Sequence, residues 1–100
     1  MPTRDLYRQK FSAQLHEWNA RLDLLVAQSE KLEVKAKLEV TPLVDAVHER
    51  LTSAKAALAE IAAATDDRWA AVVKDADKVW IDLKAAADGA NDALKRHTKH

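Results

Sequence analysis

Apolar side chains recur every third or fourth residue in YRQKFSAQLHEWNARLDLL, residues 7–25. The spacing continues beyond this stretch, and fifteen steps cover 54 residues with a mean of 3.6, the period of an α-helix. The stripe consists of Tyr7, Phe11, Leu15, Trp18, Leu22, Leu25, Ser29, Leu32, Ala36, Val40, Leu43, Val47, Leu51, Ala54, Leu58 and Ile61. It predicts one long helix over about residues 4–63.

A second stripe runs from Trp69 to His97 in eight steps over 28 residues, which predicts a shorter helix over about 66–96. Between the stripes, Thr65 or Asp66 can cap a new helix, so we expect a turn near residues 63–66. The resulting fold is all-α: one domain, residues 1–100, folded as a coiled-coil-like hairpin of a long helix and a shorter antiparallel one. Because the proposed turn has no Gly or Pro, a single unbroken rod is the alternative there.

Pro42 complicates the first helix, since proline lacks a backbone donor and crowds the preceding turn. The segment before it, residues 32–40, alternates apolar and polar residues as a strand would. No other segment alternates to pair with it, and the helical register passes through Pro42, so we expect a kinked helix. Thr41 and Pro42 also suit a helix start. A three-helix bundle broken at Pro42 is therefore the alternative architecture.

Composition limits the classes of function. The chain has one Gly, two Pro and 32% charged residues, typical of long helices. Its 16 basic and 16 acidic residues cancel, and residues 66–92 hold seven Asp against four basic side chains, so we expect no nucleic-acid partner. No cysteine is present, and no apolar run approaches the roughly 20 residues of a membrane span. We expect a cytoplasmic protein without signal peptide or membrane helix.

No constellation of residues predicts chemistry. His97 and His100 lie three residues apart but lack a third ligand at metal-binding spacing, and no phosphate loop or nucleophile motif is present. We therefore expect no catalytic residue, metal or cofactor.

Helix lengths predict association instead. A helix of nearly sixty residues would be about 85 Å long, and a partner of thirty residues would cover only half of it. The N-terminal half of the first helix would then expose an apolar stripe, which marks an interface. We expect a homodimer through this half, with other coiled-coil proteins as further partners. The interaction seam consists of Phe11, Leu15, Trp18, Leu22, Leu25, Trp69 and Trp80.

Three segments of the chain carry a family resemblance: LHEWNA at 15–20, TDDRW at 65–69 and VW at 79–80. On the strength of these segments, the chain resembles, over nearly its whole length, a family of small bacterial coiled-coil proteins. Members of that family often carry a stress-response label, which was first given to cyanobacterial proteins. The resemblance implies a helical, non-enzymatic protein and supplies no site residues. Pro42 departs from the uninterrupted charged helix that such a family would have.

These observations favour a structural or interaction protein that acts by self-association or by binding partner helices, and the resemblance implies a stress-responsive one. Reversible binding to a membrane surface is the alternative, because eleven-residue units also occur in lipid-associating amphipathic helices. The Ala-rich apolar face and the zero net charge argue against that alternative.

Overall fold

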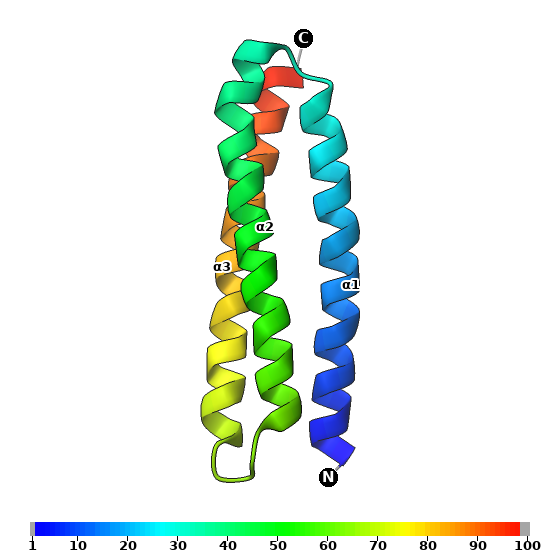
Figure 1. The fold of residues 1–100 in the computed structure, drawn as a ribbon, viewed down its shortest axis with the longest axis vertical. Helices are drawn as coiled ribbons and strands as arrows, with labels where there is room; N and C mark the ends of the chain where they lie inside the picture. Colours follow the sequence, from blue (N-terminus) through cyan, green and yellow to red (C-terminus); the bar gives the residue numbers. More distant parts are fainter. Residues whose placement is uncertain (1, 99–100) are drawn as a thin grey trace.

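The computed structural model describes residues 2–98, which form three helices: α1, Pro2–Glu30; α2, Val34–Ala63; and α3, Trp69–Thr98. They pack as an elongated bundle of 52 × 18 × 17 Å in which α1 and α3 run parallel and α2 runs antiparallel to both (Figure 1). The all-α class is confirmed, and no strand occurs within these residues. The turn expected near 63–66 is present between α2 and α3.

The expected long helix over about residues 4–63, kinked at Pro42, is wrong, because the chain turns at residues 31–33. Two tight backbone hydrogen bonds end α1: the Lys31 amide donates to the Gln28 carbonyl at 3.3 Å, and the Leu32 amide donates to the Ser29 carbonyl at 3.2 Å. The buried Ser29 hydroxyl also donates to the Val26 carbonyl at 2.8 Å, a local bond that competes with helical pairing. Glu33 is then extended, with φ −64° and ψ 156°.

Pro42 does not break the chain as the three-helix alternative proposed; it lies inside α2. The proline leaves the Leu38 carbonyl without its helical donor. Pro42 is exposed, and the Leu38 side chain one turn earlier is 75% exposed. Because this face of the helix meets water, solvent can hydrogen-bond the freed carbonyl and the helix tolerates the proline.

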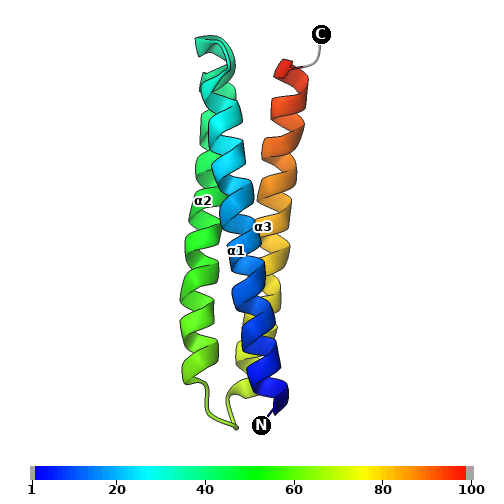
Figure 2. The same cartoon turned by 90° about the vertical axis from the view of Figure 1, so that its right-hand side faces the viewer.

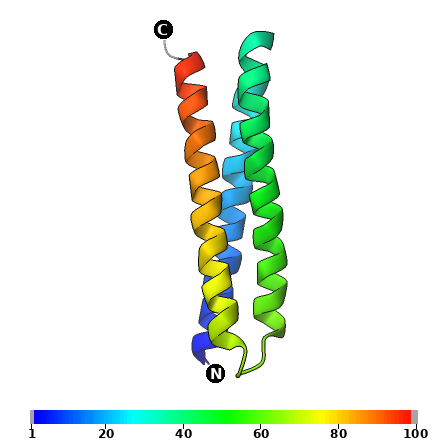
Figure 3. The ribbon, with the colours of Figure 1, turned by 90° about the vertical axis from the view of Figure 1, so that its left-hand side faces the viewer.

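The three helices lie side by side along the length of the bundle (Figures 2 and 3). Core residues come from all three helices and from nearly their whole length. The buried residues of α2 and α3 include many small ones, among them Ala54, Ala76 and Ala90, and these two helices approach each other most closely. The α1 helix stands further from its neighbours, because Phe11 and large leucines fill the space beneath it.

Candidate interaction seam

The predicted seam is covered by the chain itself. Four of its members are almost fully buried in the core: Phe11, Leu15, Leu22 and Leu25, with 1–6% of each side chain exposed. Trp18, Trp69 and Trp80 are partly buried and pack against that core. The expectation that the N-terminal stripe lacks a cover is therefore wrong: the turn at 31–33 folds α1 back, and α2 and α3 together cover it.

Aromatic side chains join α1 to α3 near the start of both helices. The Phe11 and Trp80 ring centroids are 4.5 Å apart, and Tyr7 meets Trp69 edge to face at 5.6 Å. Such tilted and T-shaped pairs stabilise beyond the area they bury. The Arg4 guanidinium lies 4.8 Å from the Trp69 ring centroid, a cation–π contact. This cluster fixes the register of α1 along α3.

Three polar contacts, made by Arg4 and Tyr7, close the same end of the bundle. Arg4 forms an ion pair with Asp66 and donates to the Ala64 carbonyl, both in the α2–α3 turn. The Tyr7 hydroxyl donates to the Asp77 carboxylate at 3.1 Å. Burial raises the pKa of Tyr7 to about 12, and the Asp77 hydrogen bond and charge act in the same direction. These contacts link α1 to the α2–α3 pair.

Trp18 does not join the other two tryptophans. It lies further along α1, where Arg21 one turn later covers its ring at 4.8 Å. A pocket between α1 and α3 at this level is lined by residues that include Trp18, Leu24 and Ala87. The sequence placed all three tryptophans in one seam, and the structure distributes them along the α1–α3 contact.

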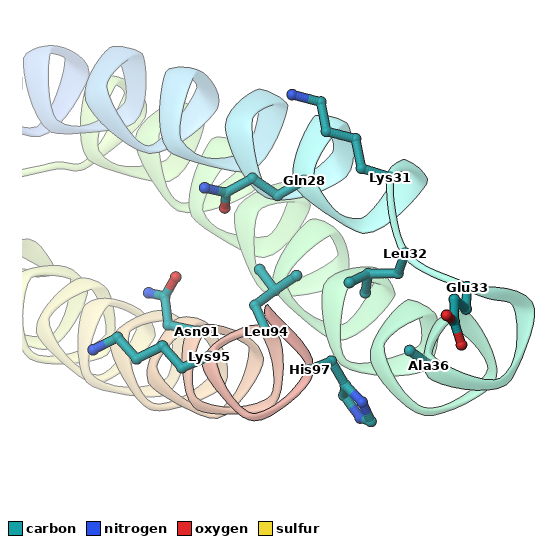
Figure 4. A pocket seen from close by; sticks show the side chains of 9 residues that line it. All are labelled: Gln28, Lys31, Leu32, Glu33, Ala36, Asn91, Leu94, Lys95 and His97. Atoms are coloured by element: carbon teal, nitrogen blue, oxygen red, sulfur yellow. The ribbon is translucent and has the colours of Figure 1, made fainter. Parts of the chain in front are cut away.

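The opposite end of the bundle is open. A hollow of about 670 Å³ separates the 31–33 turn from the end of α3, and Leu32 and Leu94 project into it (Figure 4). Its lining consists of Gln28, Lys31, Leu32, Glu33, Ala36, Asn91, Leu94, Lys95 and His97. No sequence pattern indicated this hollow, because it depends on where α1 ends.

The Glu39 carboxylate of α2 contacts two side chains at the end of α3, beside the hollow. The carboxylate accepts a hydrogen bond from Arg96 at 3.0 Å and lies 2.7 Å from His97 Nε2. The His97 hydrogen bond, aided by the Arg96 guanidinium, lowers the pKa of Glu39 below its ordinary value. Within residues 2–98 no group of three side chains could hold a metal ion, and His100 of the histidine pair lies outside the described residues.

Sequence reasoning missed an exposed apolar pair on the first turns of α2. Val34 and Leu38 lie four residues apart on one helix face, and each is 75% exposed. The alternation in residues 32–40 contained the signal: in the helix, it places Ala36 and Val40 in the core and leaves the intervening apolar residues outside.

No family model matches the sequence, and the comparisons with curated proteins and with solved structures found no match either. The resemblance to stress-labelled coiled-coil proteins therefore stays a prediction. Along residues 2–98, each helix carries too many polar and charged residues for any stretch of it to span a bilayer.

Proposed function

We propose that this chain is a non-catalytic interaction protein that binds helices, either of its own copies or of partner proteins. The observation that carries the proposal is the seating of α1. The large apolar side chains of α1 fill a groove between α2 and α3. The buried residues of these two helices include the small residues Ala54 and Ala87. An amphipathic helix laid in an apolar groove is a recurring mode of protein recognition.

Self-association remains part of the proposal, on a different basis. The N-terminal stripe is buried in the single chain, so an uncovered seam no longer argues for a homodimer. What supports self-association is that the α2–α3 groove already accepts a helix with the sequence of α1, and every copy of the chain carries that helix. A role in the stress response rests on the resemblance alone.

Membrane-surface binding gains no support from the bundle. The apolar stripes of α1, α2 and α3 face one another, so a lipid surface would have to separate the helices before meeting an apolar face. We therefore favour protein helices as ligands.

The direct test is whether the groove accepts a helix from another molecule. A fluorescently labelled peptide of residues 2–30 should bind the full-length protein, and the fluorescence anisotropy of the peptide should then rise. The apparent affinity is weakened because the tethered α1 competes for the same groove. The matched control peptide carries Phe11→Ser and Leu22→Ser. Light scattering on a size-exclusion column, over a range of concentrations, reports self-association as a rise above 11.1 kDa.

Binding of the native peptide but not of its control, or reversible self-association, supports the proposal. A chain that stays at 11.1 kDa at every concentration and binds neither peptide is not a helix-binding protein of this kind.

A further inference from the structure

We infer that two copies of this chain exchange α1 by straightening the turn at residues 31–33. In the exchanged dimer, residues 2–63 form one continuous helix, and α1 of each copy lies in the α2–α3 groove of the other. The inference rests on the proposed self-association and specifies its mechanism and its partner, a second copy of this chain.

The apolar register is the first argument. The steps through Ser29, Leu32, Ala36 and Val40 are three, four and four residues, so the stripe crosses the turn without a slip. A straight helix through this segment would keep the stripes of α1 and α2 on one face. Two such helices side by side and antiparallel would repeat, between copies, the α1–α2 packing of the single chain.

The turn itself is weakly specified. It contains no Gly or Pro, no residue of the described chain has positive φ, and the Glu33 side chain makes no capping hydrogen bond to α2. The first amides of a helix have no acceptor within it, and straightening the turn would give those of α2 carbonyl acceptors in α1. The local hydrogen bonds of Ser29, Lys31 and Leu32 can be replaced by helical ones, so the main opposition to a helical conformation at 31–33 is the packing of α1 onto its own chain.

The exchange keeps the contacts between α1 and the α2–α3 pair but forms them between two chains. Only a second copy of this chain supplies the same contacts, so the partner is specific. The core contacts of Phe11, Leu15, Leu22 and Leu25 would form with the second copy as they do within one chain. Arg4 with Asp66 and Tyr7 with Asp77 would become contacts between copies. Because a short connection favours exchange of an element between identical chains, the three-residue turn is a suitable hinge.

The turn offers a discriminating substitution. Val34 is the first residue of α2 and is 75% exposed, and Glu33 before it already has the extended conformation that precedes proline. Val34→Pro therefore suits the single-chain bundle. In a continuous helix the same proline would collide with the Glu30 carbonyl. The control is Val34→Ala, which removes the same side chain but permits a helix.

A chemical cross-link reports the exchange directly. The sequence has no native cysteine, and Gln28 of α1 and Asn91 of α3 are both exposed and line the same hollow. In Gln28→Cys/Asn91→Cys, a short bismaleimide should join the two thiols within one chain in the monomer and between chains in the exchanged dimer.

The experiment refolds the double-cysteine protein from urea at low and high concentration, separates the species by size exclusion, and cross-links each. We expect the high-concentration dimer to become covalent and its maximum dimension in X-ray scattering to reach about 93 Å, the length of a 62-residue helix, against 52 Å for the bundle. Val34→Pro, placed in the same background, should lower the dimer association constant about 100-fold relative to Val34→Ala, since each of the two long helices gains an interior proline whose ring crowds the Glu30 carbonyl even where water solvates that carbonyl. Val34→Ala should leave the dimer in place.

Three results would overturn the exchange. A dimer whose cross-links stay within each chain shows association through another surface, so the proposed function stands and the exchange fails. A dimer whose association constant is the same in Val34→Pro and in Val34→Ala, with unchanged circular dichroism, excludes the continuous helix. A chain that remains monomeric at every concentration excludes the exchange as well, and peptide binding then decides separately whether the helix-binding proposal survives.

Discussion

The packing of Phe11 gives the sharpest test of how α1 is covered. Phe11 is 1% exposed and its ring centroid lies 4.5 Å from that of Trp80. Replacing a buried Phe by Ala costs about 3–5 kcal/mol, and we expect about 3 kcal/mol because α1 stands far enough from its neighbours to settle inward. Such a loss is a large share of the roughly 5–15 kcal/mol that stabilises a domain of this size.

The assay is urea unfolding, followed by circular dichroism and by tryptophan emission, at low protein concentration. With a denaturant slope of about 1.5 kcal/mol per molar, Phe11→Ala should lower the unfolding midpoint by about 2 M. The control, Leu6→Ala, alters a residue of the same helix that is 63% exposed, and its effect should stay within about 0.5 kcal/mol.

Two results would refute the reasoning. A Phe11→Ala midpoint no lower than that of Leu6→Ala would mean that the ring does not lie in a core. A midpoint that depends on protein concentration already in the low range of this assay would mean that a second copy supplies the cover even there.

Three further predictions concern packing and titration. Ala90→Leu should destabilise the bundle by about 1–3 kcal/mol in the same urea assay, because Ala90 is fully buried in the core; an unchanged midpoint would exclude close packing at this site. The single tyrosine, Tyr7, should ionise near pH 12 in an absorbance titration, and Asp77→Asn should lower the Tyr7 pKa. Because this pKa is raised in the folded state, the contribution of Tyr7 to stability holds below about pH 10 and is lost as pH rises toward 12. A Tyr7 titration at its ordinary pKa would contradict the burial. Because the pKa of Glu39 is lowered in the folded state, Glu39 contributes stability above its ordinary pKa of 4.5, and this contribution is lost as pH falls through the folded-state pKa. His97→Ala should raise the Glu39 pKa toward 4.5 in a carboxyl NMR titration. An unchanged Glu39 pKa would exclude His97 as the cause of the shift.

The sequence was sufficient for the helical class and for the second turn. The 3.6-residue spacing from Tyr7 onward can belong only to helices, and the acids after Thr65 mark a helix start that the structure places between Ala63 and Trp69. The turn at 31–33 was not predictable from spacing, because an apolar register that runs through a turn is the same register as an unbroken helix. Pro42 drew attention to the wrong place, since the cost of a proline depends on whether the freed carbonyl meets water.

The sequence predicted which residues of the candidate seam need to be covered, but not which segment covers them. An apolar stripe must be covered, and Phe11, Leu15, Leu22 and Leu25 are indeed buried. Whether the cover comes from the same chain or from another depends on one hinge, and a sequence pattern that fits both arrangements cannot distinguish them.

The unequal spacing of the helices has a consequence for local unfolding. Because α2 and α3 approach each other closely while α1 stands off on large side chains, α1 can leave without opening the α2–α3 contact. Proteins often open in such cooperative units, each with its own free energy below that of global unfolding. In native-state hydrogen exchange, the amides of α1 would lose protection together, through an opening that leaves α2 and α3 protected, and this partly opened state is the one from which a helix can be exchanged.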